Sequence, residues 1–501
     1  MKKLMFSAAA LMCGTMMFAQ FNTSNVNTVG SGNTSSVSQI GLLNDSDVDQ
    51  LGDNNDSDVS QDGILNESQV LQGPSSNGNT SDVDQTGNLN YSFVWQDGDN
   101  NDSTVSQIGD NNYNYTDQWG DANISDVSQS GNNNESETFQ YSNMNISEVT
   151  QVGLLNDSYV YQHGGDMNIS EVLQGGTNNN SIVDQDGNMN DSFVIQGFGG
   201  DNNISDVDQN GDMNISYVDQ WGDSNNSDVD QDGNMNISTV FQGQIGDLNI
   251  STVDQDGNMN ISAVNQTGNI NDSEVLQVGD ANISNVEQTG DNNDAQVHQG
   301  FVGGLNNDFN SASIIQTGNS NFGHIDQHYN VIDDSDFNIS EMEQIGDLNF
   351  AYNWQDGDNN QSYMLQDGDL NFSDVEQHGN NNYSDVGQLG DSNISTVDQD
   401  GNNNISQVYQ GYFGDNNLSD VDQTGNGNQQ YTAQVGDDND SDTDQVGDGN
   451  FSYTWQQGFQ HYSQVLQTGN NNDSDTQQYT NNNTSFVNQL GDNNSSTVFQ
   501  N

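Results

Sequence analysis

Apolar residues in this chain recur at one fixed place in a phrase of eleven residues. From Gln39 to Gln72 the phrase Gln-x-Gly-x-x-Asn-x-Ser-x-Val-x-Gln is repeated three times, and Gln50 and Gln61 mark its period. Asn, Ser, Val and Gln alternate with variable residues over seven positions, which is the period-two pattern of a β-strand with two unlike faces. The four residues around Gly are typical of a turn. The pattern therefore predicts a strand-turn unit.

Almost the whole chain restates this phrase, so the units are expected to stack on one another. A unit this small buries its apolar face only against its neighbours. Marker positions from Thr28 to Gln500 give about 42 units. We expect an all-β chain that forms a β-solenoid, with two strands and about 22 residues in each coil. A triangular coil of three strands stays open as the alternative, and the handedness is not indicated.

The face that repeats is expected to be the buried one. When equal coils stack, each Asn lies over an Asn and each Gln over a Gln, and their side-chain amides are expected to form hydrogen-bonded ladders. Val supplies the dry contact, and Ser is small enough to let the two sheets approach. The residues predicted to form this structural ladder are, in two representative units, Asn44, Ser46, Val48, Gln50, Asn293, Ala295, Val297 and Gln299.

The first nineteen residues have a different character. Lys2 and Lys3 precede an apolar run at 4–12, which is typical of a secretory signal peptide. We expect cleavage after Ala19, so that 1–19 is the signal peptide and 20–501 is the repeat array. The alternative of lipidation at Cys13 has a poor preceding context.

Departures from the period of eleven all fall in predicted turns. The two longest add six residues after Gln299 and six after Gln327. Solenoids tolerate such insertions because the stacked strands are untouched. The segment 300–337 is the best candidate for a hinge or an irregular segment.

Composition alone would indicate disorder, because only 30% of the residues are hydrophobic and the formal net charge is −72. The strict register argues against disorder. The chain's two basic residues and its one cysteine lie before residue 20. The array therefore has no disulfide and no basic surface for nucleic acid or anionic lipid, and neither nucleic-acid binding nor membrane insertion is expected.

Outward acidic residues are the candidates for metal chemistry. The motif DQDGN occurs four times, and oxygen ligands suit calcium. The weak calcium candidates are Asp184, Asp186, Asp230, Asp232, Asp254, Asp256, Asp398 and Asp400. The full spacing of an EF-hand loop is missing, and the same residues serve equally as charges that keep the chain soluble. No metal site is predicted with confidence and no other cofactor is expected.

Catalysis is not expected either. His324 and His328 lie four residues apart, which places them about 13 Å apart on a strand. Acidic pairs occur in every part of the array, so they define no unique cleft for glycosidase chemistry. The array has no Lys or Arg to stabilise a developing anion.

The repeated phrase resembles the curlin repeat of curli subunits, Gln-x-Gly-x-Gly-Asn-x-Ala-x-Val-x-Gln. The positions that match it most fully are Gln288, Gly290, Asn293, Ala295, Val297 and Gln299. The resemblance covers about 22–501, and the end of the signal peptide is similar to those of Bacteroidetes. Ser in place of Ala and the much greater length depart from the family.

The resemblance implies a secreted subunit that passes unfolded through a curli-type outer-membrane secretion channel. Such a subunit polymerises with itself, with the help of a curli-type nucleator, into extracellular amyloid fibres of the biofilm matrix. Whether this chain would be a major subunit or a nucleator stays open. The ladder residues would form the fibre core.

We therefore expect a curli-like functional amyloid subunit with a structural and adhesive role. The alternative is a monomeric acidic β-solenoid at the cell surface that binds calcium or glycans. Amide ladders and open ends favour the fibre. An outward aromatic row on one flat face would favour the alternative, and the sequence makes no such row evident.

Overall fold

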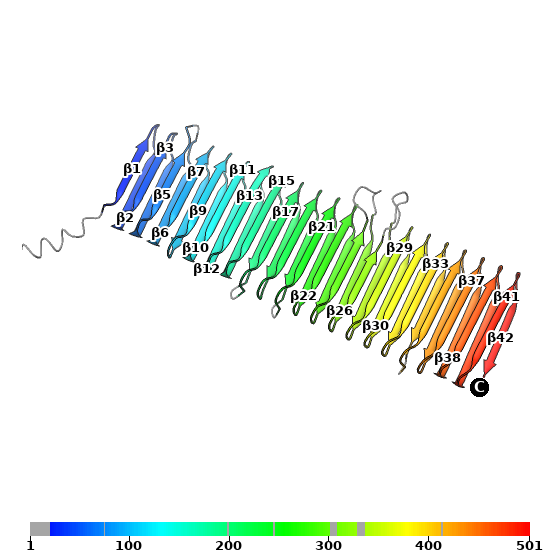
Figure 1. Ribbon diagram of the computed structural model, residues 1–501. Helices are drawn as coiled ribbons and strands as arrows, with labels where there is room; N and C mark the ends of the chain where they lie inside the picture. Colours follow the sequence, from blue (N-terminus) through cyan, green and yellow to red (C-terminus); the bar gives the residue numbers. More distant parts are fainter. Residues whose placement is uncertain are drawn as a thin grey trace, which may run out of the picture. The chain divides into compact units, whose positions relative to one another are not determined.

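A computed structural model describes residues 21–74, 76–197, 200–243, 246–300, 308–327, 336–411 and 414–501. In these ranges 42 strands follow one another and no helix occurs (Figure 1). The chain is an all-β solenoid of about 21 coils with two strands in each coil. This confirms the predicted fold class and decides against the triangular coil. The chain divides into two compact units, of which the first ends at Gln209 and the second begins at Asn210.

In unit 1 the odd-numbered strands form one parallel sheet, here called the odd sheet, and the even-numbered strands form the even sheet (Figure 1). The odd sheet contains β1 (Thr23–Thr28), β3 (Asp45–Gln50), β5 (Glu67–Gln72), β7 (Tyr91–Asp97), β9 (Tyr113–Trp119), β11 (Glu135–Tyr141), β13 (Asp157–Gly164) and β15 (Asn180–Gly187). The even sheet contains β2 (Thr34–Leu42), β4 (Asp56–Ile64), β6 (Thr80–Asn88), β8 (Asp102–Ile108), β10 (Ile124–Asn132), β12 (Ile146–Leu154), β14 (Ile169–Thr177) and β16 (Asp191–Gln196). The division between the units falls within β17 (Ile204–Asn210).

Unit 2 has the same two-sheet plan. Its even sheet contains β18 (Ile215–Gln220), β20 (Ile237–Gln242), β22 (Ile261–Thr267), β24 (Ile283–Thr289), β26 (Ser311–Thr317), β28 (Ile339–Ile345), β30 (Gln361–Asp367), β32 (Tyr383–Leu389), β34 (Ile405–Gln410), β36 (Gln429–Val435), β38 (Phe451–Phe459), β40 (Asp473–Asn481) and β42 (Ser495–Gln500). Its odd sheet contains β19 (Asn226–Asp232), β21 (Ile250–Asp256), β23 (Asp272–Val278), β25 (Asp294–Gln299), β27 (Phe322–Asp326), β29 (Phe350–Asp356), β31 (Phe372–His378), β33 (Ile394–Asp400), β35 (Leu418–Thr424), β37 (Asp440–Val446), β39 (Tyr462–Thr468) and β41 (Thr484–Leu490).

Neighbouring strands of a sheet are parallel and in exact repeat register. In β1 and β3, Val26 lies opposite Val48, and in β31 and β33, Val375 lies opposite Val397. The usual coil has 22 residues, and the coils that hold the long insertions have 28. Because register is kept in both cases, every inward side chain lies on its equivalent in the next coil.

The predicted hinge at 300–337 is only partly described. Within it, β26 and β27 are regular strands that pair with β28 and β29. The inserted residues 301–307 and 328–335 lie outside the described residues, as does the predicted signal peptide. The hinge and the signal peptide stay predictions.

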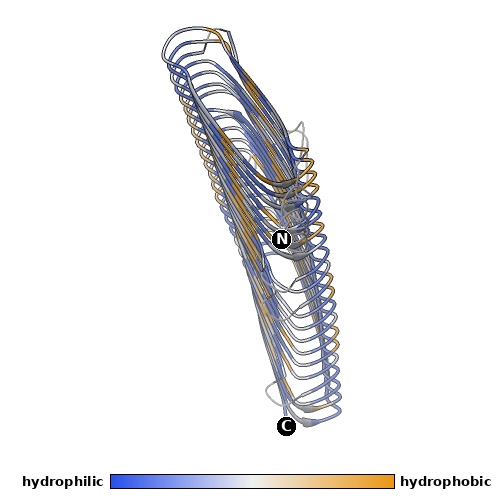
Figure 2. Cartoon of the chain, turned by 90° about the vertical axis from the view of Figure 1, so that its left-hand side faces the viewer, coloured by the Kyte–Doolittle hydropathy of each residue, from blue (hydrophilic) through white to orange (hydrophobic). Residues whose placement is uncertain are grey.

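The turns are compact because coils stack closely there. Gly109, at φ 123°, donates its N–H to the Thr86 carbonyl of the preceding coil, and a Cβ on it would lie 1.9 Å from the Gly131 carbonyl oxygen. Two residues later the chain passes through the left-handed region, at Asn111 with φ 60°. In other turns this place is taken by Met or Leu, as at Met144. Figure 2 shows such apolar residues recurring at the bends of successive coils.

Two glycines of one turn test whether close stacking or turn conformation makes Gly necessary. Gly425→Ala would place Cβ 2.2 Å from the Gly447 carbonyl oxygen at φ +116°, whereas Gly427→Ala meets no atom within 4 Å at φ +67°. We expect a loss of about 3 kcal/mol for the first and about 1 kcal/mol for the second. Urea unfolding combined with hydrogen exchange of the affected coil would measure both, and equal losses would contradict the stacking explanation.

Candidate functional site

The inward face of the coils is the part of the molecule that any assembly function would use. The predicted ladder residues lie there: Asn44, Ser46, Val48, Gln50, Ala295, Val297 and Gln299 are 0% exposed and Asn293 is 1% exposed. The Val side chains form an apolar row between the rows of buried polar side chains. Such rows are tolerated in a protein interior only when their hydrogen bonds are satisfied.

Glutamine side chains form a continuous amide ladder. Gln50 Nε2 donates to Gln72 Oε1 of the next coil at 3.0 Å and to the backbone carbonyl of Thr34 on the opposite sheet at 2.7 Å. In unit 2, Gln377 Nε2 donates in the same way to Gln399 Oε1 at 2.9 Å. Each Gln therefore joins consecutive coils and also joins the two sheets within a coil. These Gln-to-Gln bonds run from the earlier coil to the later one.

Asparagine side chains bond mainly to backbone, which differs from the expected amide-to-amide ladder. Asn44 Oδ1 accepts the backbone N–H of Asn66 at 3.0 Å, and Asn44 Nδ2 donates to the carbonyls of Ile40 and Gly63. Direct amide pairs also occur, as from Asn439 to Asn417 at 3.0 Å. The reason is position: Asn lies where the turn enters the strand, and backbone groups there need partners.

One histidine takes the place of a ladder Asn and reproduces its bonds. His461 is 1% exposed, its Nδ1 accepts the backbone N–H of Asn483 at 3.3 Å, and its Nε2 lies 3.1 Å from the Gln457 carbonyl oxygen. Nε2 is therefore the protonated nitrogen, because the other nitrogen acts as an acceptor. The ring thus fills the Asn position without breaking the row.

Many serine hydroxyls of the buried face lack hydrogen-bond partners among the described residues. The Oγ atoms of Ser46 and Ser251 are among many buried serine hydroxyls that have no hydrogen-bond partner among the described residues. A buried polar group without a partner costs free energy. Ser is used here for its small size, and the same row also holds Ala295, Ala312 and Ala351.

The structure gathers four of the eight calcium candidates into one block. On neighbouring strands, Asp230 of β19 lies opposite Asp254 of β21, and Asp232 lies opposite Asp256. Burial, followed by the charge of Asp230, raises the pKa of Asp254 to about 6. Both causes disfavour the charged carboxylate of Asp254 at neutral pH.

The other four candidates lie beside histidines. Asp184 and Asp186 of β15 contact opposite ring nitrogens of His163, at 3.1 Å and 3.6 Å. Asp400 of β33 lies opposite His378 of β31, and Asp398 lies opposite Glu376. These candidates are therefore in carboxylate–imidazole neighbourhoods, and a calcium role for any of the eight stays a prediction.

An aromatic surface covers the outward face of β7 to β13 in the odd sheet of unit 1. Tyr91 stacks on Tyr113 at 5.3 Å between ring centroids, and Phe93 stacks on Tyr115 at 4.9 Å. The surface consists of Tyr91, Phe93, Trp95, Tyr113, Tyr115, Trp119, Phe139, Tyr141, Tyr159 and Tyr161. The sequence-based view that no aromatic row is evident was therefore wrong. The rings occupy variable positions of the repeat, so the repeated phrase does not mark them.

A carboxylate is set into this aromatic surface. Asp117 is 4% exposed and accepts the Tyr141 hydroxyl at 3.1 Å. Burial raises the pKa of Asp117 to about 6, although the hydrogen bonds from Tyr141 and Trp119 act in the opposite direction. The surface thus combines flat apolar rings with hydrogen-bonding groups.

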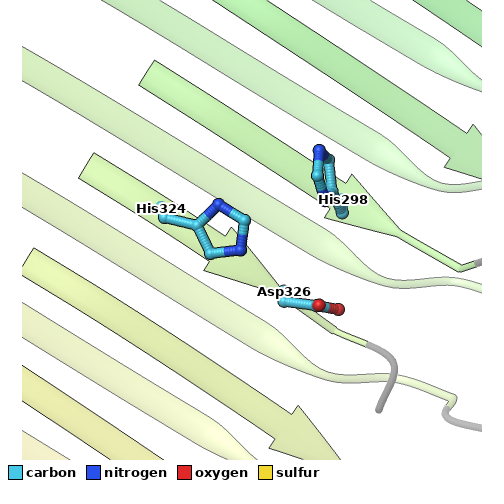
Figure 3. Close-up of side chains that lie close together, drawn as sticks. All are labelled: His298, His324 and Asp326. Carbon is cyan, nitrogen blue, oxygen red and sulfur yellow. The ribbon is translucent and has the colours of Figure 1, made fainter. Parts of the chain in front are cut away.

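A second group that the sequence did not reveal lies on the odd sheet of unit 2. His298 of β25 and His324 and Asp326 of β27 place potential metal-ligand atoms within 4.8 Å of one another (Figure 3). The sequence pairs His324 with His328, which lies outside the described residues. His298 is 26 positions before His324, and an inserted turn between them hides the proximity from any fixed period.

A family model described as the curlin-associated repeat matches residues 77–109 and 364–390. The chain carries curlin repeats. No curated protein matches the chain. In the part of the chain that the structure describes, no helix has the length and apolar character needed to cross a bilayer.

The two matched segments can be placed on the strands of the structure. The first contains β6, β7 and β8 in unit 1, and the second contains β31 and β32 in unit 2. In both, the Gln of each curlin repeat is buried and bonded to the next coil, as Gln85 is to Gln107 and Gln366 is to Gln388. The positions that repeat within the phrase therefore correspond to the inward face.

Replacing an unpartnered serine of the inward face should stabilise the array. We expect Ser251→Ala to raise the free energy of unfolding by about 0.5–1 kcal/mol, because the removed hydroxyl makes no hydrogen bond. The reverse change at the equivalent row, Ala295→Ser, should lower it by a similar amount. Urea unfolding of both variants measures the difference. A loss of stability in Ser251→Ala would show that the hydroxyl has a partner.

Acidification should stabilise the folded chain. The pKa of Asp254 is about 6 when folded and has the ordinary value of 3.8 when unfolded, so the folded state binds the proton more tightly. The stabilisation is full below pH 3.8 and is lost as the pH rises through about 6. We expect Asp254→Asn to gain about 1 kcal/mol at pH 7.5, allowing for screening of a half-exposed group, and almost nothing at pH 4.

Unfolding curves at the two pH values would measure this effect. The matched control is Asp62→Asn, which removes an exposed acid of β4 that lies outside the block. It should show a smaller change than Asp254→Asn at pH 7.5. Equal gains of Asp254→Asn at both pH values would contradict the assigned titration.

Proposed function

We propose that the chain is a secreted structural subunit of curli-like amyloid fibres in the extracellular biofilm matrix, where it serves adhesion and aggregation and not catalysis. The observation that carries this proposal is the directional Gln ladder. Between described coils the Gln amides donate to the later coil, as Gln50 does to Gln72, whereas inward Asn amides that pair directly donate to the earlier coil, as Asn439 does to Asn417. A face that donates and a face that accepts are complementary, so copies can stack head to tail.

Among the described residues, the first and the last coil each have a neighbouring coil on one side. Among the described residues, β1 and β2 pair only with β3 and β4, and β41 and β42 pair only with β39 and β40. Val26, at a core position of β1, is 45% exposed. Unpaired parallel edges with exposed apolar residues are templates for further strands.

The partners follow from this proposal. The main partner is a second copy of the chain, and the curlin repeats suggest a curli-type nucleator and an outer-membrane secretion channel as the others. Passage through a channel in an unfolded state requires a chain that stays soluble. A formal net charge of −72 favours that solubility.

Backbone direction at the last described coil gives a sharp test. Asp473 N–H donates to the Asn494 carbonyl, so the backbone N–H and C=O groups of Asn494 and of every second residue after it face β40. The backbone N–H of Thr497 therefore faces away from β40. By the same argument, Tyr462 donates to Asn483, and Asn488 of β41 faces the open side. Proline at 488 and 497 therefore removes two edge donors without touching the pairs inside the array.

We expect the double variant Asn488→Pro, Thr497→Pro to fold and to extend seeds at least about tenfold more slowly than the parent chain, since one lost edge bond is worth about 1 kcal/mol. The control is Asn488→Ala, Thr497→Ala, which keeps both N–H groups. Thioflavin fluorescence of seeded growth and negative-stain microscopy measure the rates. Unchanged growth of the proline variant would contradict stacking at this edge.

A second candidate is a monomeric acidic surface solenoid that binds calcium or glycans. The aromatic surface of β7 to β13 favours it, because flat rings beside hydrogen-bonding groups suit the apolar faces and hydroxyls of sugars. This candidate would be favoured over the fibre by two results together. The parent chain would stay monodisperse when seeded, and the Trp95→Ala variant would lose the polysaccharide binding of the parent chain.

A further inference from the structure

Two imidazoles and a carboxylate meet on the outward face of the odd sheet in unit 2. β25 and β27 are parallel neighbours in which His298 lies opposite Asp326 and Gln296 lies opposite His324. His324 and Asp326 are two residues apart, so they project from the same face. Their potential ligand atoms lie within 4.8 Å of one another, together with one of His298 (Figure 3).

The hydrogen bonds around His324 leave one of its nitrogens available. His324 Nδ1 lies 3.1 Å from Gln296 Oε1, and the amide of Gln296 is oriented because its Nε2 donates to Asp294 Oδ1 at 3.2 Å. Nδ1 therefore carries the proton and donates to Gln296. Metal-binding histidines are typically held in this way, with the second nitrogen left as the ligand.

His298 has an unpartnered nitrogen in the same place. Its Nε2 is buried and has no hydrogen-bond partner among the described residues. The nearest carboxylate oxygen to it is that of Glu274 on β23, at 3.7 Å, which is too long for a hydrogen bond. The two imidazole rings are nearly perpendicular, with centroids 5.1 Å apart.

The surroundings of both imidazoles disfavour the charged form, and metal binding needs the neutral form. Burial lowers the pKa of His298, and burial together with the neighbouring His298 lowers the pKa of His324 to about 4. The charged groups that face them are Glu274, Asp294 and Asp326. Tyr352 of β29 packs against the His324 ring at 5.4 Å and limits solvent on that side.

We propose that His298, His324 and Asp326 form a binding site for a divalent transition metal of the Zn²⁺ class. Two nitrogens and one carboxylate oxygen suit Zn²⁺, whereas Ca²⁺ prefers an all-oxygen set. Ligand atoms around tetrahedral Zn²⁺ lie about 3.4 Å apart, so side-chain rotations that move atoms by roughly 1 Å close the site. The ion joins β25 to β27, which lie in consecutive coils whose equivalent positions are 28 residues apart.

Other histidines of the array provide the control. His163 also has two carboxylates beside it, but Asp184 contacts Nε2 and Asp186 contacts Nδ1. Because these carboxylates lie at opposite ring nitrogens, they cannot both bind an ion that is held by one of those nitrogens. His163→Asn should therefore leave the tight metal site unchanged. This comparison separates the proposed site from general attraction of cations to an acidic surface.

The test is isothermal titration of the folded full chain, stripped with EDTA, with Zn²⁺ in millimolar Ca²⁺ to saturate the acidic rows. We expect one tight site per chain, weakened at least about 100-fold in His298→Asn and in Asp326→Asn, and about 10- to 100-fold in Gln296→Leu, which removes the orienting amide. Cobalt(II) absorption of the parent chain should show low-coordinate nitrogen and oxygen ligation, and this spectrum should be lost in His298→Asn.

Asp326→Asn keeps the shape of its side chain, so circular dichroism of this variant confirms that any loss of binding is local. Absence of a tight Zn²⁺ site in the parent chain would overturn the proposal. So would retention of the tight site in His298→Asn, or an equal loss in His163→Asn. The test is independent of fibre formation, because it can be read on unassembled chains.

Discussion

In-register stacking of equal side chains is the constraint on which the rest of the structure depends. An amide buried alone would lack partners, and the cost would be a few kcal/mol. Within the array each Gln has the next Gln as its partner, as Gln388 has Gln410, so the cost is removed wherever a later coil exists. Stability is then a property of the stack, since no coil satisfies its own ladder. A coil without a later neighbour leaves its Gln amides without this partner, which is the physical basis of the proposed growth by stacking.

The same constraint explains the turns. Coils can only be spaced for amide bonding if the turns also stack closely, and the carbonyl of Gly131 approaches Gly109 where any other residue would have its Cβ. Two residues on, Met144 or Asn111 takes a left-handed conformation that residues with a Cβ adopt at a cost. That cost is accepted at nearly every bend, which shows that ladder spacing takes precedence over local backbone preference.

Sequence reasoning reached the strand alternation, the buried face and the preferred two-strand coil, because each is fixed by a period visible in the chain. It did not reach the bonds of Asn44, since a repeated amide looks the same whether it meets an amide or backbone. The aromatic surface escaped because Phe93 and Tyr115 occupy variable outward positions, which the repeated phrase does not mark. His298 and His324 escaped for a further reason: an inserted turn changes their spacing, and insertion lengths carry no period.

Electrostatic repulsion between the acidic rows and hydrogen bonds between the amides act over different distances. Ladder bonds form only at contact, whereas repulsion between acidic rows extends over about 8–10 Å in physiological salt. A net charge of −72 therefore opposes the approach of two chains before any amide can bond. Once contact is made, the approaching coil satisfies a full set of buried donors and acceptors at one step. In the proposed fibre, acid rows such as that of Asp254 would set the barrier to association, and the amide rows would set the stability of the fibre. Conditions that neutralise the acids lower the barrier without altering the ladder, because Gln and Asn do not titrate.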